Sequence, residues 1–267
     1  MSSYETLVVE RRGRVGWIIF NRPDAGNALN ATMFGELEQA WLELEADPEV
    51  RVIVNAANGS TFHTGVDVKQ MARDRDALRK FSRQTRDAEL RFTAWHLGVT
   101  KPVIAAVNGT CAGGGLHFVA DADIVIAASD ATFLDPHVSI GQVVAYEGIA
   151  LARKSPMEAI LRMALVGRGE RLSAARAHQL GIVGQIVDPP DQLHDEAQAL
   201  AELIAKNSPA AMAATKKALW GALEQGLTPA CHAGAQHLVG MWGHPDQAEG
   251  PSAFADRREP QWATHSG

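Results

Sequence analysis

Cysteine is scarce in this chain of 267 residues, since only Cys111 and Cys231 are present. Two cysteines are too few for a disulfide framework, and their spacing fits no metal site. Basic residues are not in excess, because the formal net charge is -6, which excludes a basic field able to hold nucleic acid. Apolar runs are interrupted before membrane-spanning length, and the start lacks the basic-then-apolar order of a signal peptide. These absences predict a cytoplasmic protein without nucleic-acid or membrane partners.

The composition that is present is typical of a globular protein. Hydrophobic residues make up 46% of the chain and charged residues 21%, and the length allows a substantial core. No low-complexity linker or repeat divides the chain. We predict a strand-rich core over residues 1–195, followed by a helical subdomain over residues 196–267.

The first half alternates strand-like and helical patterns. Two apolar runs at 6–10 and 15–20 flank the polar turn RRGR and predict a hairpin. RVIVNA, PVIAAV and DIVIAAS are short apolar runs of the kind that is buried on both faces of a sheet. A helix is predicted between the hairpin and RVIVNA by apolar residues at helical spacing, namely Met33, Leu37, Trp41 and Leu44. The order predicts stacked α/β units.

The second half is predicted to be mainly helical from Pro156 onward. Ser208 followed by Pro209 is a helix start, with serine as the N-cap and proline at the first helical position. Another helix is predicted near 228–242, and the tail after Gly250 is expected to be loosely ordered.

Three glycine-containing segments carry the functional signal. NRPDAGNALN at 21–30 leads from a strand into a helix, and TFHTGVDVKQM at 61–71 places Gly65 where a tight turn can present a backbone amide. KPVIAAVNGTCAGGGLHF at 101–118 ends a buried strand and opens a helix, whose first amides are free to bind an oxyanion. Neither a P-loop nor the dinucleotide fingerprint is present.

Together and in this order, the three segments resemble the crotonase (enoyl-CoA hydratase/isomerase) superfamily, over roughly residues 5 to 230. The resemblance implies an α/β fold, a spiral of ββα units with C-terminal helices that form a trimer or a dimer of trimers. It also implies a lyase of fatty acid metabolism that acts on acyl-CoA thioesters, with CoA as part of the substrate and no separate cofactor.

The resemblance further implies site residues. The oxyanion hole, which holds the thioester oxygen, would be formed by the backbone amides of Val66 and Gly114. Substrate and CoA contacts would fall on the loops at 21–30 and 61–71, at Ala25, His63, Thr64, Asp67, Val68 and Lys69. Asp24 stands where family members often have a basic residue toward the CoA phosphates, which weakens one expected contact.

The sequence departs from the hydratase pattern at both catalytic glutamates, because His117 and His137 occupy those positions. Two imidazoles could share the acid and base work, one neutral and one protonated. Glu147 is a third candidate, since some family members place a working carboxylate in this loop. One alternative is therefore hydrolysis of a carbon–carbon bond, as in ring opening of a β-diketone, with His137 as base oriented by Glu147.

Other interpretations remain open for the same residues. His117 could be a packed core histidine, and Glu147 could simply place its charge in the first turn of a helix. His117, His137 and Glu147 together could imitate a metal site, but the family uses no metal, so we expect none. A catalytically silent homologue that only binds acyl-CoA is the third functional hypothesis.

Overall fold

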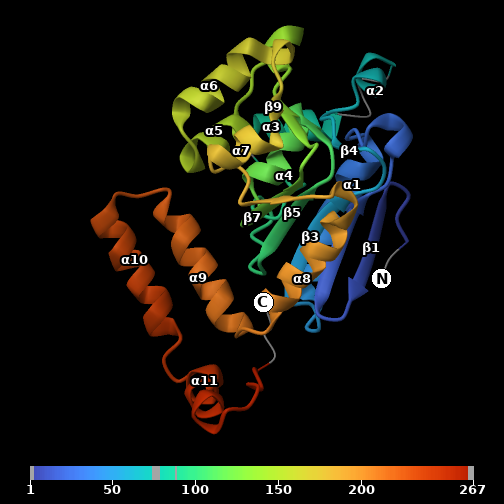
Figure 1. Ribbon diagram of the computed structural model, residues 1–267. Helices are drawn as coiled ribbons and strands as arrows, with labels where there is room; N and C mark the ends of the chain where they lie inside the picture. Colours follow the sequence, from blue (N-terminus) through green and yellow to red (C-terminus); the bar gives the residue numbers. More distant parts are fainter. Residues whose placement is uncertain (1–2, 74–78, 88, 264–267) are drawn as a thin grey trace.

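The computed structural model describes residues 3–73, 79–87 and 89–263, and its core contains two β-sheets (Figure 1). The larger sheet has the order β1 (Leu7–Arg12), β2 (Val15–Phe20), β3 (Val52–Ala57), β5 (Val103–Val107), β7 (Ile124–Ala128) and β10 (Gln185–Val187). The smaller sheet has the order β4 (Thr61–His63), β6 (Thr110–Ala112), β8 (Thr132–Leu134) and β9 (Leu172–Ser173). The predicted α/β fold class is confirmed.

The predicted hairpin is present, with β1 and β2 antiparallel around the turn at Gly13. From β2 onward the large sheet is parallel, so the carboxyl ends of its strands lie at one edge. The short strands β4, β6 and β8 follow β3, β5 and β7 in the chain and form the second sheet beyond that edge. The glycine turns of the segments 61–71 and 101–118 are therefore brought to the carboxyl edge of the larger sheet.

Helix α1 (Ala31–Ala46) confirms the predicted amphipathic helix. Asn30 caps it by accepting a hydrogen bond from the Met33 amide at 2.8 Å. The apolar positions predicted from helical spacing are all buried, as are Phe34 and Ala40. The helix thus covers the sheet with the face that the sequence pattern predicted.

Helix α8 (Leu193–Ala205) lies across the predicted boundary between residues 195 and 196. It packs against β2, β3, β5 and β7 and buries Ala197, Ala201 and Ala205 against them. The division of the chain into a core and a helical subdomain stays a prediction. Small alanine side chains allow the helix to approach the sheet closely, a consequence that composition alone does not reveal.

Six shorter helices surround the small sheet and the site. They are α2 (Val68–Arg73), α3 (Arg79–Arg86), α4 (Leu116–Ala120), α5 (Tyr146–Lys154), α6 (Met157–Val166) and α7 (Ala174–Gln179). Helix α4 packs on α5, and α5 packs on α6. This succession connects the glycine segment before α4 to the loop that precedes α5.

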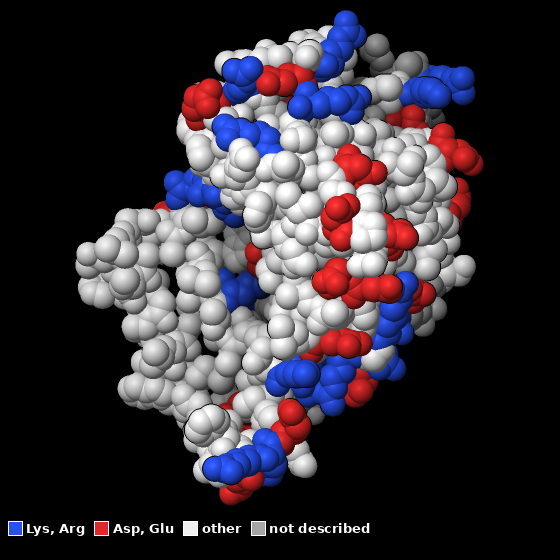
Figure 2. Space-filling view, in the orientation of Figure 1, with Lys and Arg blue, Asp and Glu red and all other residues white. Residues whose placement is uncertain are grey.

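The last three helices form an arm that stands away from the sheets (Figure 1). They are α9 (Pro209–Ala222), α10 (Leu227–Gly240) and α11 (Pro245–Asp256). Ser208 is the predicted N-cap of α9, and its hydroxyl accepts from the Ala211 amide at 3.1 Å. Helix α10 contains no charged residue, and the α9–α10 arm is largely white in Figure 2.

The expectation of a loose tail after Gly250 is wrong for the described residues. Helix α11 continues to Asp256, and Trp262 donates its indole N–H to the Lys206 carbonyl at 2.6 Å. The Ala263 amide donates to Asp246 at 2.8 Å. The tail is fixed by these long-range hydrogen bonds, which no local pattern announces. Within the described residues, no helix is both long enough and apolar enough to cross a bilayer.

Candidate active site

The two glycine segments touch through their backbones. Gly65 has φ +87°, and a Cβ on it would lie 2.9 Å from the Gly114 nitrogen. A Cβ on Gly114 would lie 3.7 Å from the Val66 nitrogen. A side chain at position 65 would therefore force the segments apart and strain the turn. This close approach places the amides of Val66 and Gly114 beside each other, as the predicted oxyanion hole requires.

Among the described residues, no turn or loop hydrogen bond uses the backbone N–H of Val66 or of Gly114. Two hydrogen bonds form the bridge between Leu29 and Val66. The Leu29 N–H donates to the Gly65 carbonyl, and the Asp67 N–H donates to the Leu29 carbonyl. The bridge therefore does not use the Val66 N–H. Gly114 lies in the short 3-10 turn before α4, and the first amides of a helix have no partner within it. Two adjacent free donors suit a developing oxyanion.

His63 lies beneath this pair of amides and is fully buried. Its Nδ1 accepts the Gly65 N–H at 3.0 Å, and its ring packs on Phe20 and Phe118. Burial lowers its pKa to about 3, so the ring is neutral. The side chain has no exposed surface in this structure, and its predicted CoA contact stays a prediction that this burial does not favour. Its contact instead holds the Gly65 turn.

The other predicted CoA contacts divide into two groups. Exposed side chains gather on the two loops, at Ala25, Thr64, Val68 and Lys69. Asp67 is engaged internally: it lies 3.2 Å from Arg22 and accepts hydrogen bonds from the amides of Lys69 and Gln70. The Asp67 carboxylate therefore fixes the start of α2. The exposed side chains of the two loops stay accessible to a ligand.

His137 is held by a carboxylate that the sequence analysis missed. Oδ1 of Asp135 accepts hydrogen bonds from His137 Nδ1 and from the His137 backbone N–H, each at 2.9 Å. Asp135 is only 1% exposed. A carboxylate can only accept, so Nδ1 carries the proton and Nε2 of a neutral ring is the free base. The local signal was available, because an Asp two residues before a residue commonly accepts from that residue's amide.

The His137 ring lies beside the glycine segment. A Cβ on Gly113 would be 3.6 Å from His137 Cε1 and 3.5 Å from Pro136 Cδ. Hydrogen bonding to Asp135 is the main cause that raises the pKa of His137 above its ordinary value, with a further contribution from the charge of Glu147. The rigid turn therefore delivers a polarised imidazole next to the predicted oxyanion hole.

Glu147 lies between the two predicted catalytic histidines. Its Oε1 is 3.5 Å from His137 Nδ1, and its Oε2 is 3.3 Å from His117 Nε2. It is 4% exposed, at the start of α5. Burial raises its pKa to about 7, so the carboxyl group holds a proton for part of the time near neutral pH. The structure thus brings His117, His137 and Glu147 together.

His117 is electrostatically unlike His137. Burial on α4 lowers its pKa to about 3, and neighbouring imidazoles add to the shift, so the ring is neutral. It packs edge-on against Phe92, with ring centroids 4.9 Å apart. Its Nδ1 is buried without a hydrogen-bond partner among the described residues. A neutral ring is better suited to hold Glu147 in position than to carry a proton.

Behind His117 lies a second polar layer that sequence reasoning missed. The Thr93 hydroxyl donates to Asp121 at 2.6 Å and contacts His96 Nδ1 at 2.7 Å. Burial lowers the pKa of His96 to about 4 and raises that of Asp121 to about 6. The rings of His96 and His117 are 5.7 Å apart between centroids. The turn that contains Thr93 and His96 thus packs against Asp121, the residue that caps the end of α4.

A largely apolar pocket adjoins this layer. Its lining combines aromatic, aliphatic and charged side chains, namely Trp95, His96, Asp121, Tyr146, Ile149, Ala150, Arg153, Trp220, Leu223 and Glu224. The Tyr146 ring lies 6.4 Å from the His117 ring between centroids, and its hydroxyl donates to the Thr85 carbonyl. Tyr146 therefore forms a wall between the pocket and the histidines.

Two groups of side chains are compact enough to chelate a metal ion. Asp135, His137 and Glu147 form one, and His96, His117 and Asp121 form the other, with ligand atoms within 4.8 Å of one another in each group. In the first group, Nδ1 of His137 and Oδ1 of Asp135 are already joined by a hydrogen bond. We assign no metal role to either group.

Two adjacent free amides at the end of glycine-rich turns, facing an acid–base cluster, define the class of enzymes that stabilise an oxyanion derived from a carbonyl group. The "Enoyl-CoA hydratase/isomerase" family model matches residues 10–265, so the chain belongs to that family, within the crotonase superfamily.

Similar proteins agree along their whole length. A probable enoyl-CoA hydratase of Mycobacterium bovis is 34% identical, covering 98% of this chain and 99% of its own. The (E)-benzylidenesuccinyl-CoA hydratase of Thauera aromatica is 32% identical, covering 95% and 97%. The crystal structure of an enoyl-CoA hydratase/isomerase from Mycobacterium paratuberculosis superposes with a TM-score of 0.89 at 37% identity, covering 98% of this chain and all of that one.

Proposed function

We propose that the protein adds water to an enoyl-CoA thioester, with the Asp135–His137 pair in place of the usual glutamate base. The observation that carries the proposal is the 2.9 Å hydrogen bond from His137 to buried Asp135 beside the glycine segment. This bond fixes the tautomer in which Nε2 can take a proton from water. Membership of the hydratase/isomerase family supports an acyl-CoA substrate.

The proposed reaction conserves every proton. Water oxygen bonds to the β-carbon while His137 Nε2 accepts a water proton, and the electron pair of the double bond moves to form the thioester enolate. The amides of Val66 and Gly114 donate to the enolate oxygen, an interaction worth about 3–4 kcal/mol for each donor in comparable sites. Protonated Glu147 then donates to the α-carbon. The proton on His137 Nε2 then passes to solvent water, and Glu147 takes up a proton from solvent, which completes the cycle.

The proposed roles follow from the different surroundings of the two acid–base groups. His137 must be neutral to act as base, whereas Glu147 must be protonated to act as acid. The raised pKa of Glu147, about 7, allows this form near neutral pH. His117, whose Nε2 faces Glu147 at 3.3 Å, would orient the carboxyl group without carrying charge. In the working state, His137 is therefore neutral and Glu147 is protonated.

The acyl group is proposed to enter the pocket behind Tyr146. Trp95, Tyr146 and Trp220 bring aromatic rings to this pocket, and flat rings stack well on aromatic walls. The name of the Thauera aromatica relative also specifies an aryl-substituted acyl group. We therefore propose a substrate with a cyclic or aryl acyl group. CoA would lie over the exposed loop residues Ala25, Thr64, Val68 and Lys69.

We propose that the chain assembles as a homotrimer or a dimer of trimers through its helical arm. Exposed apolar side chains concentrate there, including Leu219, Leu227, Leu238, Trp242 and Phe254. Contiguous exposed apolar surface marks interaction sites. Light scattering on the purified chain is expected to give three or six copies, and a monomer would contradict this.

Mass spectrometry with crotonyl-CoA, cyclohexenyl-carboxyl-CoA and cinnamoyl-CoA tests the reaction. The expected result is the addition of one water molecule, faster for the ring-bearing thioesters than for crotonyl-CoA. Binding of the thioesters without any mass change would instead support a catalytically silent acyl-CoA-binding protein. Equal rates on all three would reject the ring preference and leave the hydration intact.

A second candidate function is hydrolysis of a carbon–carbon bond in a β-dicarbonyl compound. The specific observation in its favour is again the Asp135–His137 pair, which activates water as such a reaction requires. Water would add to one carbonyl carbon, the carbon–carbon bond would break, and the departing enolate would sit on the Val66 and Gly114 amides before protonation. Ring opening of a cyclic 1,3-diketone, with no hydration of enoyl-CoA, would favour this function.

A further inference from the structure

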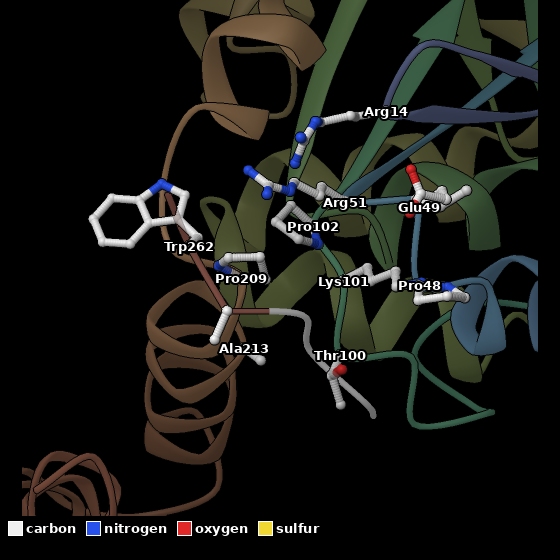
Figure 3. A pocket seen from close by; sticks show the side chains of 12 residues that line it. Arg14, Pro48, Glu49, Arg51, Thr100, Lys101, Pro102, Pro209, Ala213 and Trp262 are labelled. Atoms are coloured by element: carbon white, nitrogen blue, oxygen red, sulfur yellow. The ribbon is translucent and has the colours of Figure 1, made fainter. Parts of the chain in front are cut away.

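A second cavity lies at the opposite end of the large sheet from the candidate active site. It forms where β2, β3 and β5 begin, and its volume is about 160 Å³ (Figure 3). Arg14 comes from the hairpin turn and Arg51 from the residue before β3, while Trp262 of the C-terminal tail closes one side. The cavity therefore joins three parts of the chain that are far apart in sequence.

The two arginines face each other without a carboxylate partner. Figure 3 shows both guanidinium groups directed into the cavity. Among the described residues, neither lies within 4.0 Å of a carboxylate oxygen, although Glu49 is part of the lining. Burial, and then the charge of Arg14, lower the pKa of Arg51, whereas the charges of Asp246 and Glu49 raise it. The two guanidinium groups repel each other, and an anion bound between them would relieve this repulsion.

The other hydrogen-bonding groups nearby are already engaged. Arg51 donates through Nη1 to the Ala205 carbonyl at 2.9 Å, and its backbone N–H donates to the Arg14 carbonyl at 2.8 Å. The Lys101 ammonium donates to the carbonyls of Leu44 and Asp47 at 2.7 and 2.6 Å. These bonds fix Arg51 and Lys101 and leave most of the guanidinium donors of the pair facing the cavity.

We propose that this cavity binds a phosphate-type dianion between Arg14 and Arg51. The planar donor fork of arginine matches the oxygens of a tetrahedral oxyanion, and two forks can satisfy a dianion. Such an anion would tie the hairpin turn to the strand start beneath Trp262, and so would stabilise the packing of the C-terminal tail. This inference is independent of the proposed reaction, because the site lies at the other end of the strands.

Titration with inorganic phosphate tests the proposal, with chloride at matched ionic strength as reference. Isothermal calorimetry on the full chain is expected to show saturable phosphate binding, accompanied by a phosphate-dependent rise in melting temperature. Glycerol phosphate in a parallel titration distinguishes free phosphate from a phosphate ester as the ligand. Absence of saturable binding by both would overturn the proposal.

Substitution locates the site. Arg14→Gln is the principal variant, because the Arg14 side chain is exposed and makes no hydrogen bond within the described residues that its loss would break. Phosphate affinity is expected to fall about tenfold in this variant, and binding to vanish in the double variant with Arg51→Gln. Arg11→Gln removes the same charge from the same hairpin outside the cavity and should bind normally. Equal loss in both single variants would show general charge attraction and overturn the site.

Discussion

The surroundings of His137 and of His117 give opposite properties to two imidazoles that share one carboxyl neighbour. Glu147 lies 3.5 Å from the first and 3.3 Å from the second. His137 has Asp135 at 2.9 Å and a raised pKa, whereas His117 is enclosed by aromatic rings and has a pKa lowered to about 3. A hydrogen-bonded carboxylate outweighs partial burial at His137, while burial is the main cause of the lowered pKa at His117. In the proposed reaction, this difference separates a proton carrier from a positioning group.

Replacing the proton carrier should have the largest effect. His137→Ala is expected to lower kcat/KM by about 10³–10⁴-fold, because no other side chain is placed to take the water proton. KM should change little, since the ring binds no part of CoA in the proposed complex. Steady-state kinetics on the preferred enoyl-CoA measures both values. Wild-type turnover in this variant would remove His137 from the mechanism.

Removing the carboxylate charge of Asp135 should bring the pKa of His137 closer to that of His117. Asp135→Asn is expected to reduce kcat/KM by about 10²–10³-fold, because the tautomer is no longer fixed. The pKa of His137 should fall, and base activity grows as this group loses its proton, so the acidic limb of the pH–rate profile should move to lower pH. Asp130→Asn, an exposed substitution in the neighbouring loop, is the matched control. An unmoved limb would show that Asp135 acts only in folding.

Replacing Glu147, the carboxyl group between the two histidines, tests whether it acts as the acid. Glu147 must be protonated to donate, so wild-type activity should decline as pH rises through about 7. Glu147→Gln cannot titrate, and its residual activity, about 10²-fold lower, should lack this alkaline decline. A pH–rate profile of kcat/KM records the limb. If the decline persists in the variant, another group supplies the proton.

The smallest effect is expected in stability and concerns His117. In the unfolded chain this histidine titrates near pH 6.5, whereas in the folded protein it stays neutral down to about pH 3. Its contribution to stability is therefore complete above pH 6.5 and is lost on acidification, by about 1.4 kcal/mol for each pH unit. His117→Leu should lose stability less steeply than wild type between pH 6.5 and 4.5 in urea unfolding. Exposed His232→Leu should keep the wild-type slope.

Local patterns predicted the parts of the site that depend on neighbouring residues. The Gly65 turn, the free amide before α4 and the Ser208 cap each follow from a few adjacent positions, and each is present. Asp135 is of the same kind, because its partner His137 is only two residues away, although the sequence analysis did not name it.

Long-range packing decided what could not be predicted. The family resemblance implied a CoA contact for His63, but the chain folds Phe20 and Phe118 onto this side chain and buries it. The layer of His96 and Asp121 behind His117 forms because the turn that contains His96 packs against α4. No spacing pattern encodes such contacts.

The sequence by itself determined the fold class, the family resemblance and the three candidate acid–base residues, because glycine turns, apolar periodicity and residue identity are local properties. The tertiary structure alone decided the surroundings of those residues, from which the proposed role of each is argued. Burial and the distance to the nearest charge set each pKa, and both arise only when α4, α5 and the Asp135 turn are packed around the same carboxyl group.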